Sequence, residues 1–156
     1  MIVHPFLPEL FDSLGVWRDR QFAHPQAQRR AVALLTYLAF GDRPVLEYDL
    51  LLPKLLAAWP WAEPLPPHGL SESERQACDQ LLAAVLQHWQ ALRSSSADWL
   101  RETFFWRDGK FTPVDGGWRL TIERHAQDVL LNRLPWGLGV IYLPWMTEVL
   151  HVSWLN

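Results

Sequence analysis

Apolar residues recur every three or four positions through the first two thirds of the chain. This spacing predicts helices over Pro5–Leu14, Pro25–Phe40 and Glu47–Trp59. A glycine follows each of the first two segments and marks its end. Pro53 has no N–H to donate, so the third segment is expected to kink or to start afresh at that residue.

The longest apolar stripe follows a capping box, in which Ser71 and Glu74 are spaced to cap the start of a helix. The stripe consists of Cys78, Leu81, Leu82, Val85, Leu86, Trp89 and Leu92. Because Cys78 lies on this stripe, it is predicted to be a small buried hydrophobe and not a nucleophile. A further short helix is expected over Ala97–Phe104.

The pattern changes after Phe105, where Asp-Gly turns separate short runs of alternating polarity. Strands are predicted over Lys110–Val114, Trp118–Glu123, Val140–Leu143 and Val149–Trp154, the last as a candidate edge strand. Asp128–Leu134 fits either a strand or a helix. The predicted fold is a single α+β domain over residues 1–156. Its N-terminal two thirds are mainly helical and pack on a small antiparallel β-sheet at the C-terminal end.

The segment Pro60–Gly69 contains four prolines and is predicted to be a stiff extended connector. A proline-rich segment is also a ligand for proline-recognising modules, which would require it to stay exposed. Trp59 and Trp61 favour cover instead, because a large indole ring is costly to leave in water.

Composition and charge narrow the classes of partner. The chain has 156 residues, 49% of them apolar, which suffices for a core. The chain has 14 basic and 17 acidic residues. Because there is no excess of positive charge, neither a nucleic-acid partner nor an anionic membrane surface is expected. Prolines and glycines interrupt the longest uncharged stretch, after Leu134, so membrane insertion is not expected. A lone cysteine and the absence of an export signal favour assembly in the cytoplasm.

The sequence carries no recognisable catalytic or metal-binding motif. Gly-x-Ser-x-Gly and His-Glu-x-x-His are both missing, and one cysteine cannot supply a structural zinc site that needs two thiolates. His88 lies near the edge of the long apolar stripe and is expected to be a structural histidine. His125 lies three residues before Asp128 and could pair with it locally, but without a defined pocket partner the two do not constitute a site. We therefore predict no enzyme activity, no cofactor and no metal.

Ten tryptophans and 12 prolines are the unusual counts. Tryptophan is enriched at protein interfaces, where its ring supplies area and its N–H needs an acceptor. Trp136 and Trp145 stand in Pro-Trp strings expected in loops, and Trp154 lies near the terminus, so these three are predicted interface residues. An alternative reading is a tryptophan-rich carbohydrate or cell-wall binding module, which would need coplanar exposed rings.

Several strings together resemble one family, the C-terminal region of tape measure proteins from extracellular contractile injection systems. They run in a consistent order from His4-Pro5-Phe6-Leu7-Pro8 and Leu52-Pro53-Lys54-Leu55-Leu56 to Leu134-Pro135-Trp136-Gly137 and Leu143-Pro144-Trp145-Met146. Between these lie Arg30-Ala31-Val32, His88-Trp89, Leu100-Arg101-Glu102-Thr103-Phe104 and Gly117-Trp118-Arg119-Leu120. The matches cover nearly the whole chain.

The resemblance implies a role in assembling the inner tube of a phage-tail-like particle and in setting its length, with no catalytic residues. The implied partners are inner-tube, baseplate or cap components, and a homo-oligomer is plausible because such particles are built from rings. The protein would be cytoplasmic during assembly and later part of the particle. Even as one helix, 156 residues would reach only about 230 Å, and prolines interrupt the pattern. We therefore expect a folded end domain that docks the tape to a neighbouring component.

Overall fold

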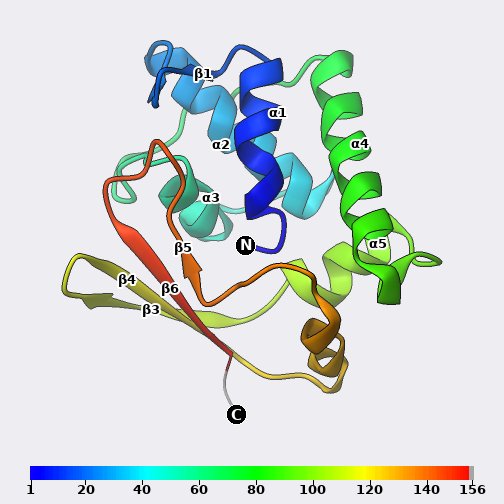
Figure 1. The fold of residues 1–156 in the computed structure, drawn as a ribbon. Coiled ribbons are helices and arrows are strands. Elements are labelled where there is room, and N and C mark those ends of the chain that lie inside the picture. Colours follow the sequence, from blue (N-terminus) through cyan, green and yellow to red (C-terminus); the bar gives the residue numbers. More distant parts are fainter. Residues whose placement is uncertain (155–156) are drawn as a thin grey trace. The chain divides into compact units, whose positions relative to one another are not determined.

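The protein adopts the predicted α+β fold in a computed structural model that describes residues 1–154. A four-stranded sheet forms at the C-terminal end, as expected (Figure 1). The residues divide into two compact units. The helical unit comprises Phe6–Leu81 and Leu143–Thr147, and the sheet unit comprises Met1–Pro5, Leu82–Tyr142 and the described part of Glu148–Asn156. That the chain is one domain stays a prediction.

The helices of the helical unit begin and end close to the predicted residues. They include α1 (Leu7–Ser13), α2 (Pro25–Phe40) and the first part of α4 (Glu72–His88), with the short turn η1 (His4–Phe6) before α1. His24 caps α2, because its Nδ1 accepts a hydrogen bond from the N–H of Ala27 at 3.0 Å. Gly41 ends α2 with a φ of 62°, which side-chain-bearing residues rarely adopt.

The predicted restart near Pro53 takes the form of a change in helix type. A 3₁₀ turn, η2 (Glu47–Leu50), leads into α3 (Leu51–Leu56), so Pro53 lies in the first turn, where no N–H is needed. The helix ends before the predicted Trp59, because Ala58 takes a positive φ of 53°. Gln28 donates to the carbonyls of Ala57 and Ala58 at 3.0 and 2.7 Å and stabilises this end.

The proline-rich connector that follows has no helix or strand between residues 60 and 69. The expectation that Trp61 is covered is wrong, because this side chain is 58% exposed.

A small hairpin in the helical unit was not predicted. It joins β1 (Trp17–Arg18) to β2 (Gln21–Phe22) through Asp19 and Arg20, both with positive φ. Two such residues form the turn that best matches strand twist, usually built from Asn-Gly or Asp-Gly. The sequence Asp-Arg does not carry that signal.

The sheet unit begins with the last turns of α4 and short helical pieces before its strands. These elements are η3 (Gln90–Leu92), α5 (Ala97–Leu100), a π-helical turn η4 (Arg101–Phe105), β3 (Gly109–Val114), β4 (Gly117–Ile122), η5 (Ala126–Arg133), β5 (Val140–Ile141) and β6 (Val149–Trp154). Asp128–Leu134, which fitted either type, thus lies mostly in a 3₁₀ helix.

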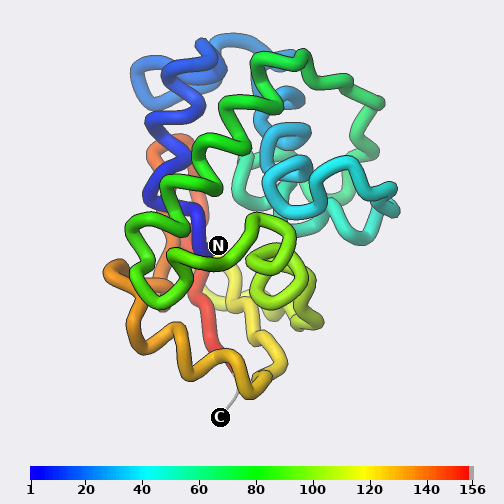
Figure 2. Tube along the Cα trace, turned by 90° about the vertical axis from the view of Figure 1, so that its right-hand side faces the viewer, coloured from blue at the N-terminus to red at the C-terminus, as the bar shows by residue number. Residues whose placement is uncertain are grey.

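The sheet is mixed, whereas a wholly antiparallel sheet was predicted. Its strand order is β3-β4-β6-β5, and β4 pairs with β6 in parallel. Residues 123–148 provide the long connection that a parallel pair requires, and Figure 2 follows this segment from yellow through orange to the red β6. The expectation that β6 is an edge strand is wrong, because it pairs on both sides.

The two faces of the sheet differ in burial. Register places Leu120, Ile122, Leu150, Val152 and Ile141 on one face, and all of them are at most 8% exposed. The opposite face carries Thr112, Arg119 and His151 side by side, and these are exposed or partly exposed. The alternation predicted for β4, with Leu120 and Ile122 inward, is therefore observed.

Gly117 allows the close approach of β6 to β4. A Cβ built at this position would lie 2.0 Å from the carbonyl oxygen of Val149 and 2.8 Å from its nitrogen. Both are backbone atoms, so they cannot rotate away as the end of a side chain would.

We expect Gly117→Ala to lower the free energy of unfolding by about 1–3 kcal/mol, because β4 and β6 must move apart. Gly137→Ala is the matched control in the same unit: its Cβ would have no heavy atom within 4 Å. Urea denaturation followed by circular dichroism measures both. Equal midpoints for Gly117→Ala and the parent chain would contradict the close approach.

Candidate interaction surfaces

Trp145 lies inside the helical unit. Its ring centroid is 5.0 Å from that of Phe11, 5.2 Å from Trp17 and 5.8 Å from Phe22, and only 6% of the residue is exposed. Its indole N–H donates to the carbonyl of Leu56 at 2.7 Å. The expectation of an open ring at this position is wrong, because four segments distant in sequence enclose it.

Trp136 and Trp154 belong to the sheet unit and are both partly exposed. The indole N–H of Trp136 donates to the carbonyl of Ile2 at 2.9 Å, and His4 shares a hydrogen bond of 3.0 Å with the carbonyl of Gly137. Burial lowers the pKa of His4 below its usual value. These contacts join the start of the chain to the loop before β5.

Trp154 lies against a buried ion pair. The guanidinium carbon of Arg107 is 5.3 Å from its ring centroid, a cation–π distance, and Arg107 pairs with Asp128. Both charged side chains are at most 4% exposed. Asp128 also accepts a hydrogen bond from the N–H of His125. The two residues, three apart in the sequence, thus cap the start of η5 and do not form a catalytic pair.

Among the tryptophans of the described chain, Trp89 and Trp145 are buried and most of the others are partly exposed. Only Trp61 is exposed, and Trp17, Trp59, Trp89, Trp136 and Trp145 each donate an indole N–H to a backbone carbonyl. A carbohydrate module would need several exposed coplanar rings, and the described residues present a single exposed ring. Among residues 1–154, the several exposed rings that this alternative requires are therefore not observed.

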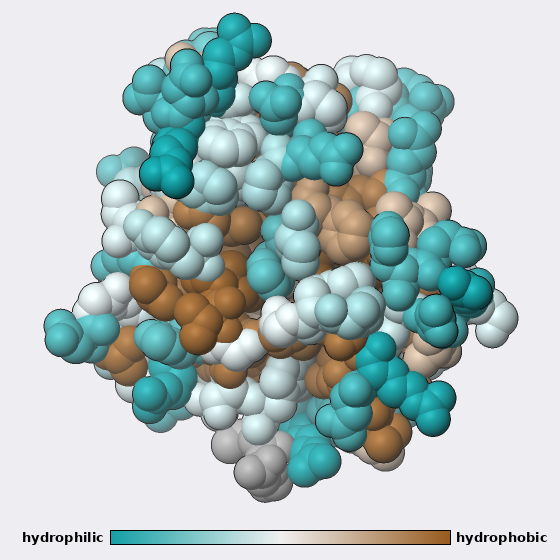
Figure 3. Space-filling model, viewed as in Figure 1, coloured by the Kyte–Doolittle hydropathy of each residue, from teal (hydrophilic) through white to brown (hydrophobic). Residues whose placement is uncertain are grey.

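Large apolar side chains reach the surface elsewhere, and the face drawn in Figure 3 has brown, hydrophobic areas among the teal. In the helical unit they are Leu46, Tyr48 and Trp61, and in the sheet unit Val129, Val140 and Tyr142, each between 56% and 75% exposed. Periodicity alone did not find these residues, because all lie outside long helices.

The buried Lys54 ties together the two segments that carry the exposed residues of the helical unit. It is 2% exposed, pairs with Glu47 and donates to the carbonyl of Glu63 at 2.8 Å.

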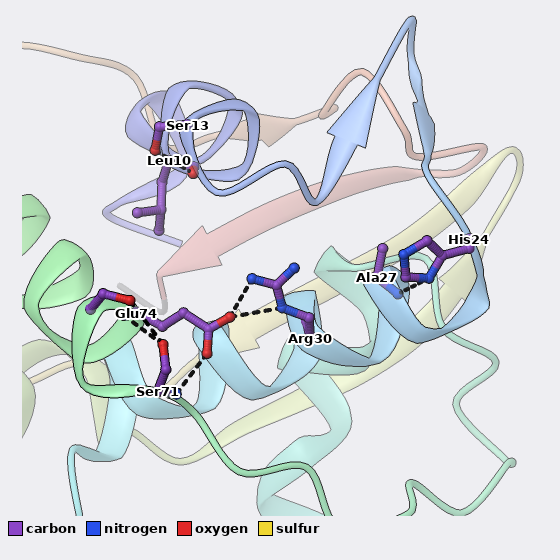
Figure 4. A network of polar contacts seen from close by, with 8 residues as sticks. Leu10, Ser13, His24, Ala27, Arg30, Ser71 and Glu74 are labelled. Atoms are coloured by element: carbon purple, nitrogen blue, oxygen red, sulfur yellow. Dashed lines mark hydrogen bonds and ion pairs between the residues drawn. The ribbon is translucent and has the colours of Figure 1, made fainter.

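The best-connected polar network of the helical unit surrounds Glu74, as Figure 4 shows. The predicted capping box is present: the N–H of Ser71 donates to Glu74 at 2.8 Å, and the N–H of Glu74 donates to the Ser71 hydroxyl at 3.2 Å. Arg30 of α2 pairs with the same carboxylate, which is 9% exposed. Burial alone would raise the pKa of Glu74, but the hydrogen bonds from Ser71 and Arg30 outweigh it and lower the pKa.

Side chains that could hold a metal do not gather in the described part of the chain: residues 1–154 contain no group of three or more His, Cys, Asp or Glu in suitable positions. Within the same residues, no helix has both the length and the apolar character needed to cross a bilayer. Cys78 is buried, and its thiol lies 4.0 Å from the carbonyl of Leu34.

The described residues form an α+β protein in which several tryptophans donate their indole N–H groups to backbone carbonyls of the same chain. The chain matches the family described as contractile injection system tape measure protein over residues 1–154, nearly its full length. It belongs to this family, which confirms the resemblance and gives it a structural role in a contractile injection system. No curated protein and no solved structure matches the chain.

Trp145→Ala is expected to lower the free energy of unfolding by about 3–5 kcal/mol, because it removes a buried ring and leaves the Leu56 carbonyl without its donor. The control is Trp61→Ala in the same unit, where 58% exposure predicts a change within about 0.5 kcal/mol. Urea denaturation followed by circular dichroism compares the two. Similar losses in both variants would contradict the enclosed position of Trp145.

Glu74→Gln is expected to reduce the acid sensitivity of the protein. Because folding lowers the pKa of Glu74, its contribution to stability is complete above the ordinary value of 4.5 and is lost as the pH falls through the folded-state pKa. Carboxyl groups titrate between roughly pH 5 and pH 3. Over this range the parent chain should therefore lose more stability than the variant. Parallel pH profiles of the unfolding midpoint would contradict the assignment.

Proposed function

We propose that this chain is a folded docking domain that attaches a tape measure to a neighbouring component of a contractile injection particle. Its partner would be an inner-tube, baseplate or cap component. The proposal combines family membership with one observation: the described residues fold into short helices and strands.

The lengths of the helices support an attaching role over a spanning role. The longest described helix, α4, has 17 residues and therefore a length of about 25 Å. A segment that sets tube length by its own extension must lengthen in proportion to its residues. Residues held in short helices and a sheet instead add a fixed distance, so setting the tube length falls to extended parts of a tape.

Trp136 and Trp154 are the proposed contact residues among the three predicted tryptophans. Both are partly exposed, so a partner can reach part of each ring. Trp145 is not proposed as a contact residue, because its ring packs against α1 and the β1–β2 hairpin inside the helical unit.

Co-purification tests the proposal. The tagged chain is coexpressed with tube, baseplate and cap components of one particle, and we expect it to retain one of them selectively. Trp136→Ala and Trp154→Ala should weaken retention by about tenfold if their rings lie at the centre of the interface.

Circular dichroism first establishes that both variants are folded. Trp61→Ala serves as the control for loss of an exposed ring in the other unit. Retention of no component by the parent chain would overturn the docking function. Full retention by both tryptophan variants would leave docking intact and remove these two rings from the interface.

A further inference from the structure

The open face of the four-stranded sheet carries an apolar patch beside a cation. Register places Val114, Gly117 and Val149 in one row and Arg119 with His151 and Val140 in the next. Tyr142, two residues beyond Val140, is 60% exposed, and Val140 is 56% exposed. We call Val114, Arg119, Val140, Tyr142, Val149 and His151 the outer sheet surface. Figure 3 shows brown surface where Figure 1 draws β5 and the start of β6.

Arg119 is the only permanently charged member of the outer sheet surface. The structure gives its guanidinium no hydrogen-bond or ion-pair partner among residues 1–154, and the residue is exposed. The surface contains no carboxylate. Of the acidic residues near the sheet, Asp115 lies in the hairpin turn and Glu123 follows the end of β4. Glu148, directly before β6, accepts from the indole N–H of Trp118 at 3.1 Å.

The edges of the sheet are poorly suited to receive a further strand. The outer strand β3 contains Pro113, which has no N–H, and the exposed Lys110. The other outer strand, β5, has two residues. A partner that engages this sheet would therefore cover its face and not extend its ladder.

We propose that the outer sheet surface docks a particle component through a segment that presents apolar side chains next to a carboxylate. The inference rests on the docking function proposed above but not on Trp154, which register places beside Ile122 on the opposite face of the sheet. It names the chemistry of the partner. Covering Val140 and Tyr142 also covers Arg119, and a buried cation without a counter-charge is strongly unfavourable. An acidic group of the partner opposite Arg119 satisfies this requirement and fixes the orientation of the complex.

A second copy of this chain does not meet the same requirement by two-fold pairing. In a two-fold interface the same patch meets itself, so Arg119 and His151 of both copies would be covered together. No carboxylate of the patch would then face either guanidinium. The charge pattern thus favours an acidic partner of another kind.

The experiment measures binding of the purified chain to the component that it retains, by biolayer interferometry at two salt concentrations. Tyr142→Ser and Arg119→Glu should each weaken binding by about tenfold or more. Val129→Ser, on η5 of the same unit and 61% exposed in the parent, is the matched control and should change binding by less than about threefold. Added salt should weaken the parent more than Arg119→Gln.

Each outcome bears on a separate statement. If the parent, Tyr142→Ser and Arg119→Glu all bind a component equally well, the proposal that the outer sheet surface is the docking site is overturned. The docking function itself would stand. If the parent binds no component, the docking function itself fails. Light scattering gives the remaining alternative: a dimer that Tyr142→Ser converts to a monomer would make a second copy the occupant. Restoration of Arg119→Glu binding by an acidic-to-Lys substitution in the partner would establish the charge pair.

Discussion

The sheet unit depends on the close parallel approach of β4 and β6 at Gly117. Without a side chain at this position, the backbone of Val149 lies directly beside β4, and β6 continues in register to Trp154. This placement brings Leu150 and Val152 next to Leu120 on the buried face. It also brings His151 next to Arg119 on the open face. Side chains alternate between the two faces along each strand. The position of β6 beside β4 therefore determines both the buried face and the outer face of the sheet.

The many tryptophans are explained by irregular backbone as much as by core volume. Carbonyl groups outside helices and sheets still need donors when they are buried, and the indole N–H supplies one from a large apolar ring. Trp145 connects the segment after β5 to the end of α3, and Trp89 connects the end of α4 to η5. Both acceptors lie near the ends of short helices, where the last carbonyls have no partner within the helix.

Local patterns predicted the helices well, because their signals lie within a few residues. The Ser71–Glu74 box and Gly41 act within one turn, and the structure has both as predicted. Long-range pairing was less predictable. The parallel pairing of β6 and the enclosure of Trp145 depend on residues far away in the sequence. The local sequence Pro144-Trp145 does not indicate that the ring will contact Phe11 or donate to Leu56. Trp61 is exposed against expectation for the same reason. Whether other residues cover its ring depends on distant parts of the chain and not on the local sequence.

Arg119 is the residue on which the proposed docking through the open sheet face depends. An arginine at the centre of a covered sheet face would be desolvated, whereas on the open face it keeps its hydration until a partner with a carboxylate replaces the water. The valines beside it supply contact area on a rigid backbone, so little conformational entropy is lost on binding. The proposed docking function therefore needs both features of the open face, the apolar side chains for contact area and Arg119 for the orientation of the partner.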